Sequence, residues 1–244
     1  RQRQMCIRDR QQTEAQQESY FVAQLAAEAK RPDVAAPATI DSLISKLSYL
    51  KEEEIDLVRA AHEYARKAHD GQTRRTGHAY ITHPIAVAEI LANMNLDHQS
   101  LMAALLHDVI EDSEVNRSGL SEIFGSSVAD LVDGVSKLSK IFASRDEAQA
   151  ENFQKMAMAM AKDIRVIIVK MADRLHNMRT IGVMSDAQRK RIARETIDFY
   201  APIANRLGVQ MIKSELEELA FRALYPFRSQ RIAQAVIGAR GNRK

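Results

Sequence analysis

The chain of 244 residues is long enough for one large domain or two small ones, and its 45% hydrophobic and 27% charged residues are ordinary for a soluble globular protein. A single cysteine excludes an internal disulfide framework, and no stretch approaches the roughly 20 apolar residues of a membrane helix, so we expect a cytoplasmic protein. The net charge of +3 comes from two basic ends, residues 1–31 and 228–244, which does not indicate a nucleic-acid-binding surface.

The composition favours helices throughout, because glycine and proline are scarce and strong helix formers are abundant. Residues 1–38 are rich in Gln, Arg, Glu and Ala, and we expect them to form a disordered tail. The first ten do not begin with Met, and we expect them to be non-native.

Apolar residues then recur at spacings of three and four, which predicts helices separated by polar turns and by a loop over 71–80. Thr39 or Asp41 can cap the first helix, and Gly71 can end the second. The helical segments that we expect are 39–50, 51–70, 83–96, 98–112, 118–138 with a break at Gly125, 152–163, 164–181, 186–208 and 210–225. The predicted fold class is therefore all-α.

One segment, LLHDVIED at 105–112, places an imidazole and three carboxylates in a helix that otherwise reads as core. On a continuous helix, Glu111 lies one turn beyond His107 and Asp108. Asp112 lies one turn beyond Asp108, so the four side chains share one edge. Burying carboxylates together is costly unless a divalent cation neutralises them. The alternative at this point is a buried, hydrogen-bonded His–Asp pair.

Further ligands must come from other helices, because two adjacent residues cannot fill a coordination sphere. His83 begins the helix expected over 83–96, and Asp173 lies on the helix expected over 164–181. On that second helix one edge carries Asp173, His176, Asn177 and Thr180. The order of His, then His-Asp, then Asp is typical of HD-type metal phosphohydrolases, and mixed His and Asp ligands suit manganese, iron or zinc.

Five motifs, in order over about residues 40–244, make the chain similar to the hydrolase half of the RelA/SpoT-homologue family of alarmone enzymes. They are GQTRRTGHAYITHPIAVAEILANMNLD, SLMAALLHDVIED, LVDGVSKL, ADRLHNMRT and YAPIANRLGVQMIKSELEELAF. The resemblance implies an HD-domain helical bundle with additional C-terminal helices. It also implies hydrolysis of the 3′-diphosphate of the guanosine nucleotides ppGpp and pppGpp to GDP or GTP and pyrophosphate. The implied cofactor is Mn2+ or another divalent transition metal.

Position by position, the resemblance implies roles for eleven residues. The metal ligands are His83, His107, Asp108 and Asp173. Glu111 and Asp112 position and deprotonate the attacking water. The substrate contacts are Arg74, Arg75, Thr76, Asn177 and Thr180. From the residues alone, Arg74 and Arg75 can also be merely solvated, although arginines suit the charge of a diphosphate ester.

The resemblance also implies the organisation of the chain and its partners. We expect an HD hydrolase domain over 39–190 and C-terminal helices over 191–244 that lead to a synthetase domain absent from this sequence. The expected partners are a guanine nucleotide and regulatory proteins that bind through missing C-terminal regions, with no direct nucleic-acid or membrane partner.

Two other functions compete with alarmone hydrolysis. The first is an HD phosphohydrolase for another nucleotide, against which the GQTRRTG and RLHNMRT matches argue. The second is a regulatory module that binds alarmone without cleaving it, which would not need a water-activating carboxylate pair. A ferritin-like di-metal bundle is excluded, because no Glu-x-x-His motif occurs.

Overall fold

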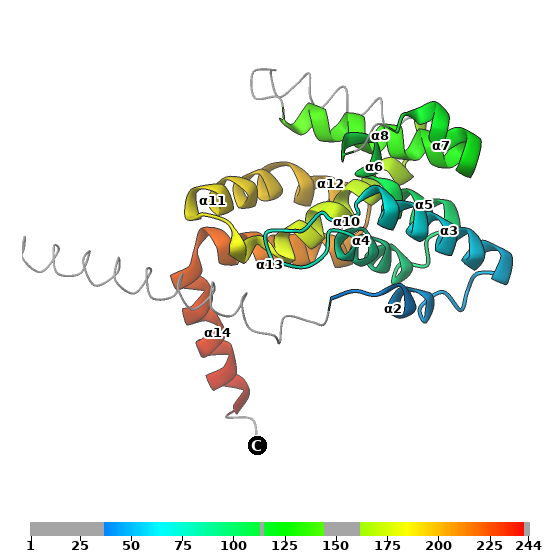
Figure 1. The fold of residues 1–244 in the computed structure, drawn as a ribbon. Helices are drawn as coiled ribbons and strands as arrows, with labels where there is room; N and C mark the ends of the chain where they lie inside the picture. Colours follow the sequence, from blue (N-terminus) through cyan, green and yellow to red (C-terminus); the bar gives the residue numbers. More distant parts are fainter. Residues whose placement is uncertain (1–36, 113–114, 144–161, 242–244) are drawn as a thin grey trace, which may run out of the picture. The chain divides into compact units, whose positions relative to one another are not determined.

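The computed structural model describes residues 37–112, 115–143 and 162–241, and these residues fold into helices joined by turns (Figure 1). Residues 1–36 of the expected disordered tail and most of the helix expected over 152–163 lie outside them. The helices are α2 (Ile40–Ile44), α3 (Glu52–Ala68), α4 (Thr82–Ala92), α5 (His98–Leu106), α6 (Val109–Asp112), α7 (Arg117–Phe124), α8 (Ser126–Ala143), α10 (Arg165–Arg179), η1 (Ile181–Val183), α11 (Asp186–Glu195), η2 (Thr196–Tyr200), α12 (Ala201–Arg206), α13 (Gln210–Leu224) and α14 (Pro226–Gly241).

Within these described ranges, extended pairing is limited to one isolated antiparallel bridge between Thr73 and Ala79, in the predicted loop. The prediction of an all-α protein is therefore confirmed. The described chain divides into two compact units, 37–176 and 177–241, and α10 crosses the division. The domain limits at 39–190 and 191–244 stay predictions.

The first unit is built around α5, which packs against α3, α4 and α8. Residues 100–106 of α5 are all buried, with no polar face. A helix that is apolar all round belongs in the centre of a bundle. The LMAALL run of the sequence therefore forms the central helix that leads directly to His107.

Several predicted helix ends are confirmed. The hydroxyl of Thr39 accepts a hydrogen bond from the Ser42 backbone N–H and so caps α2. Gly125, at φ 84°, separates α7 from α8 in a conformation that glycine adopts without a side-chain clash. The prediction that Gly71 ends the second helix is wrong, because α3 ends at Ala68 with His69 as its C-cap, and Gly71, at φ 73°, lies in the turn that follows.

The continuous helix predicted over 98–112 is wrong, because α5 ends at Leu106 and α6 begins at Val109. His107 and Asp108 lie in the turn between them. Adjacent residues of a regular helix point about 100° apart. The turn instead brings His107 Nε2 to 3.1 Å from Asp108 Oδ1, so the shared helical edge is replaced by a tighter arrangement.

In the second unit, α13 packs against α11, α12 and η2. The helix predicted over 186–208 is one nearly continuous helical path, in which η2 is a turn of π-helix around the buried Tyr200. Gly208, at φ 73°, ends this path before α13 begins.

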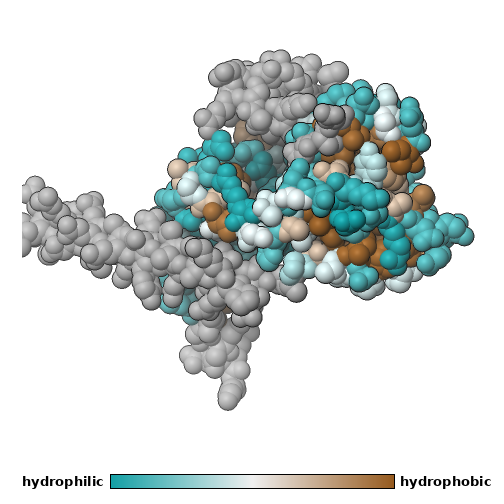
Figure 2. Space-filling view, in the orientation of Figure 1, coloured by the Kyte–Doolittle hydropathy of each residue, from teal (hydrophilic) through white to brown (hydrophobic). Residues whose placement is uncertain are grey.

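The described surface is mostly hydrophilic on the face in view, with apolar residues interspersed (Figure 2). Leu57 and Ile123 are among the large apolar side chains that remain exposed. Such exposure is usual, since polar groups cannot cover a whole protein surface. Among the described residues, no helix combines the length and the apolar character needed to cross a membrane.

α8 and α10 approach each other closely at Gly134. A Cβ atom added there would lie 2.9 Å from Val166 Cγ2, inside the normal van der Waals distance. Gly119, on α7, has room for a side chain, because the nearest atom to an added Cβ is 3.8 Å away. The two positions therefore separate the cost of crowding from the general effect of replacing a helical glycine.

We expect Gly134→Ala to lower the free energy of unfolding by about 1–3 kcal/mol, because the methyl group pushes α10 away from α8. The matched control, Gly119→Ala, should raise it by about 0.5–1 kcal/mol, because alanine loses less backbone entropy in a helix. Urea unfolding of both variants measures the two changes in the free energy of unfolding. Equal changes in the two variants would contradict the close contact between Gly134 and Val166.

Candidate metal centre

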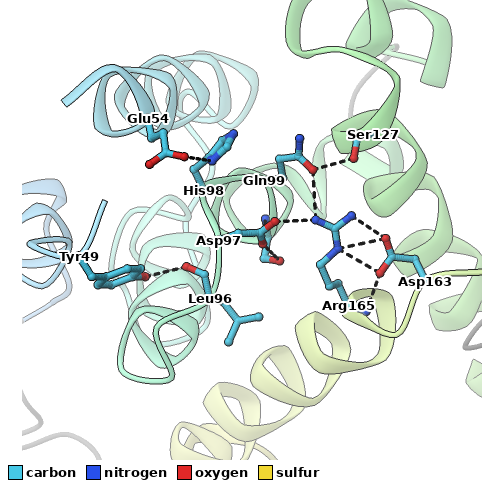
Figure 3. A network of polar contacts seen from close by, with 10 residues as sticks. Tyr49, Glu54, Leu96, Asp97, His98, Gln99, Ser127, Asp163 and Arg165 are labelled. Atoms are coloured by element: carbon cyan, nitrogen blue, oxygen red, sulfur yellow. Dashed lines mark hydrogen bonds and ion pairs between the residues drawn. The ribbon is translucent and has the colours of Figure 1, made fainter. Parts of the chain in front are cut away.

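An ion-pair network in the first unit links the helix that leads to His107 with the helix that carries Asp173 (Figure 3). Arg165, at the start of α10, donates to Asp97 Oδ2 at 2.6 Å and to Asp163 Oδ2 at 2.7 Å. Asp97 is the N-cap of α5, where it accepts from the Ser100 N–H. Arg165 also donates to Gln99, which in turn accepts from Ser127 on α8. The network thus joins the starts of α5, α8 and α10.

Four of the predicted site residues come together from three segments. His83 lies in the first turn of α4, His107 and Asp108 lie between α5 and α6, and Asp173 lies on α10. His83 and His107 are 2% exposed and Asp173 is 5% exposed. Ligand atoms of His83, His107 and Asp108 all lie within 4.8 Å of one another, so these three could hold a metal ion.

The distances within the group fit a single ion. His83 Nε2 lies 3.3 Å from Asp173 Oδ1 and 3.7 Å from Asp108 Oδ2. His107 Nε2 lies 3.1 Å from Asp108 Oδ1 and 3.9 Å from Asp173 Oδ1. Two ligand atoms about 2.1 Å from one ion are roughly 3 to 4 Å apart at ordinary bond angles. Both imidazoles therefore present the same atom, Nε2, to a common point.

The hydrogen bond of His107 leaves Nε2 as the ligating atom. Its Nδ1 donates to the Ala104 carbonyl at 2.8 Å, near the end of α5, where helix carbonyls lack partners within the helix. In the neutral ring, the other nitrogen then carries the lone pair. Nε2 is buried and makes no hydrogen bond, which fits an atom that needs a cation.

Each carboxylate accepts a hydrogen bond from a different side chain. The Tyr80 hydroxyl donates to Asp108 Oδ2 at 2.7 Å, and the Lys170 ammonium donates to Asp173 Oδ2 at 2.7 Å. Asp173 Oδ1 is the oxygen that faces both imidazoles. These contacts orient the carboxylates, as outer partners of metal ligands generally do.

The charges of the group also call for a cation. Burial lowers the pKa of His83, which favours the neutral ring that binds metals. Burial opposes the charge of His107 as well, but the carboxylates of Asp108 and Asp173 outweigh it and raise the pKa of His107 to about 9. Burial would raise the pKa of Asp108, yet His107 keeps it well below its usual range. A proton on His107 thus provides positive charge that a metal ion would replace.

The other predicted site residues are spread more widely. In the loop, Arg74 and Thr76 are half-buried, whereas Arg75 is exposed. Glu111 is exposed on α6, and Asp112 lies on the same helix, with its side chain outside the described part. Asn177 and Thr180 fall in the second unit, where the Thr180 hydroxyl donates to the Asn177 carbonyl at 3.4 Å.

Three residues that touch the group were missed as site residues. Tyr80 precedes His83 by three positions, Lys170 precedes Asp173 by three, and His176 follows Asp173 by three. His83 Nδ1 lies 2.7 Å from His176 Nδ1. For Lys170 and His176, which share α10 with Asp173, the spacing of three from a candidate ligand was the available signal, because residues three apart are neighbours on a helix. Tyr80 lies in the turn before α4, where this spacing carries no such signal.

A comparison with protein families agrees with this geometry. The family model described as HD domain matches residues 61–210, which include all four clustered residues. The chain belongs to the HD domain family. The matched range also contains the adjacent residues His107 and Asp108.

Similar HD proteins include long enzymes of guanosine nucleotides. The chain is 59% identical over 198 residues to the bifunctional (p)ppGpp synthase/hydrolase SpoT of Escherichia coli K12, covering 81% of this chain and 28% of that protein. It is 53% identical over 182 residues to a GTP pyrophosphokinase of Myxococcus xanthus, covering 73% of this chain and 24% of that protein. The chain thus spans about a quarter of the length of these relatives, and the predicted resemblance to the RelA/SpoT-homologue family is confirmed.

Among solved structures, the chain is similar to that of a metazoan ortholog of SpoT that hydrolyses ppGpp. The match has 26% sequence identity and a TM-score of 0.47, and it covers 68% of this chain and 94% of the other.

We expect Arg165→Ala to lower the free energy of unfolding at pH 7 by about 1–2 kcal/mol, because it removes partly buried, charge-assisted hydrogen bonds. Arg165 keeps the pKa of Asp163 below its usual value, so this stabilisation is present above about pH 4, near the unfolded pKa, and is lost as the pH falls through the lower folded pKa. Denaturant unfolding of both proteins between pH 3 and 7 measures the difference.

The matched control for Arg165→Ala is Arg117→Ala, which removes an exposed pair with Asp130. This control should cost less than about 1 kcal/mol. A difference between wild type and Arg165→Ala that stays constant down to pH 3 would contradict the role of the carboxylates.

Proposed function

We propose that this chain is a metal-dependent phosphohydrolase that removes the 3′-diphosphate of ppGpp and pppGpp, releasing pyrophosphate and GDP or GTP. The observation that carries the proposal is the buried group in which His83, His107 and Asp108 aim their ligand atoms at one point, in a chain of the HD domain family. Relatives with 58% and 55% identity are named guanosine-3′,5′-bis(diphosphate) 3′-pyrophosphohydrolase, which supports the choice of substrate.

The proposed ligands are His83, His107, Asp108 and Asp173, with Mn2+ as the expected ion. Two imidazoles and two carboxylates suit manganese and other divalent transition metals. A divalent cation bound there supplies a Lewis acid that offsets phosphate charge and lowers the pKa of water. The protein holds the four side chains in place beforehand through Tyr80, Lys170 and the hydrogen bonds of the two histidines.

Glu111 and Asp112 are the proposed proton acceptors. Glu111 follows Asp108 by three residues, and its backbone N–H donates to the Asp108 carbonyl, so α6 begins directly beside the metal ligands. The water oxygen attacks the phosphorus bonded to the 3′ oxygen, and that P–O bond breaks. The 3′ oxygen is the leaving group and takes a proton from solvent to become the 3′ hydroxyl of GDP or GTP, while the pyrophosphate that is released carries the oxygen of the water. The carboxylate takes the proton of the water, and the exposure of Glu111 lets it pass that proton to solvent.

Substrate binding is proposed for Arg74, Arg75, Thr76, Asn177 and Thr180. The two arginines stand in the loop between α3 and α4, shortly before His83, and their guanidinium groups suit the phosphate oxygens of a diphosphate ester. The HD hydrolase domain over 39–190 and the linking helices over 191–244 belong to the same proposal, as do regulatory protein partners.

A second candidate function is binding of alarmone without cleavage. It is favoured by one observation, the name GTP pyrophosphokinase carried by a relative that is 53% identical, since such a name describes synthesis. Another HD substrate, such as a deoxynucleoside triphosphate, is the third candidate. Both are outcomes of the following assay.

We expect the full chain to release pyrophosphate from ppGpp in the presence of Mn2+ and to stop when a chelator is added. Ion-exchange chromatography separates GDP, pyrophosphate and intact nucleotide. Binding of ppGpp without release of pyrophosphate would favour the regulatory function over hydrolysis. Turnover of a deoxynucleoside triphosphate, with ppGpp left intact, would replace the proposed substrate.

Two kinds of variant separate metal binding from proton transfer. Asp108→Ala should abolish Mn2+ binding and turnover together, because it removes a ligand. Glu111→Ala or Asp112→Ala should retain Mn2+ but lower kcat by about 100-fold or more, since general-base catalysis contributes that much. Calorimetric Mn2+ titration and the pyrophosphate assay give the two readouts, and full turnover in Asp108→Ala would overturn the ligand assignment.

A further inference from the structure

A line of polar contacts runs from the loop between α3 and α4 to one of the proposed metal ligands. Arg74 Nη1 lies 3.2 Å from His176 Nδ1, and His83 Nδ1 lies 2.7 Å from the same His176 atom. The Arg74 guanidinium is also 5.8 Å from the centre of the Tyr80 ring, which it covers. All of these residues belong to the first unit.

The donors and acceptors in this line favour one arrangement, in which the single lone pair of His176 Nδ1 is shared between Arg74 and His83. A guanidinium can only donate, so His176 Nδ1 must be an acceptor toward Arg74. An acceptor at His176 Nδ1 requires a donor at His83 Nδ1, because two lone pairs at 2.7 Å would repel each other. His83 therefore carries its proton on Nδ1.

The consequence of this tautomer appears on the other side of the His83 ring. Its Nε2 then has a lone pair, and this atom lies 3.3 Å from Asp173 Oδ1, toward the other proposed ligands. In the opposite tautomer, Nε2 would carry a hydrogen and could not bind a metal ion. His107 reaches the same state by donating from Nδ1 to a backbone carbonyl. For His83, a side chain on another element takes the place of that carbonyl.

We propose that Arg74 is a positioning residue of the metal centre, which acts through His176 to hold His83 in the tautomer that binds the cation. This inference rests on the proposed metal ligands, and it gives Arg74 a role that is independent of substrate. The guanidinium does not touch the ion; it determines which His83 nitrogen is available to the ion.

The proposal predicts that removing Arg74 weakens cation binding, whereas electrostatic repulsion alone predicts that removing it strengthens cation binding. Removing a positive charge near a cation site should strengthen cation binding, because the repulsion falls. Removing the donor that fixes His83 should weaken it, and loss of an outer partner of a metal ligand typically costs 10–100-fold in affinity. The two effects of one substitution therefore point in different directions.

The test is Mn2+ titration of the metal-free full chain by calorimetry, without nucleotide. We expect Arg74→Ala to weaken Mn2+ binding by about tenfold. The matched control is Arg75→Ala, which removes the same charge from the exposed neighbouring residue and should leave binding equal or slightly tighter. Thermal unfolding of the metal-free proteins verifies that each variant is folded.

Two His176 variants test whether Arg74 acts through that residue. His176→Ala should weaken Mn2+ binding, and adding Arg74→Ala to it should cause no further loss, since the two residues form one line of contacts. His176→Asn should restore most of the affinity, because an amide oxygen near the position of Nδ1 can accept from both neighbours. A merely structural role of the His176 ring would not be rescued by the smaller amide.

Equal or tighter Mn2+ binding by Arg74→Ala would overturn the proposal, as would additive losses in the double variant. If the wild-type chain binds no Mn2+, the proposed metal centre fails and this inference fails with it. If the wild type binds Mn2+ and releases pyrophosphate while Arg74→Ala binds as tightly, only the role of Arg74 is wrong.

Discussion

The structure of the first unit depends on keeping two carboxylates and two imidazoles together in its interior. Asp108 and Asp173 cannot both stay ionised there without positive charge, which the Lys170 ammonium supplies to Asp173 and a proton on His107, whose pKa is raised, supplies chiefly to Asp108. A divalent cation serves the same purpose with stronger bonds. The surrounding helices are arranged so that the four side chains meet from three segments, which no single helix could achieve.

Each of the four side chains is hydrogen-bonded to a group outside the cluster. A backbone carbonyl holds His107, a phenol and an ammonium hold the carboxylates, and His176 holds His83. Such partners limit the rotation of a ligand and select its tautomer. The centre is therefore preorganised before any ion or substrate arrives. The Arg165 network adds support at a distance, since it joins the starts of α5 and α10.

Much of the fold was predictable because its signals are local. Spacings of three and four identified the helices, the Gly125 break separated α7 from α8, and the apolar LMAALL run identified a buried helix. The break after Leu106 was not predictable, because no glycine or proline marks it. The His107 ring donates to the Ala104 carbonyl three residues before it and faces the adjacent Asp108, and the tertiary contact at this break is with Asp173 on α10.

The sequence by itself determined which chemistry this chain carries, since His83, the His107–Asp108 pair and Asp173 are recognisable by type and order. Only the tertiary structure decided how those residues are held. Tyr80 meets Asp108 from 28 positions away, and His176 meets His83 and Arg74 from 93 and 102 positions away. Residue types specify what a side chain can donate or accept, whereas packing specifies the partner that it meets.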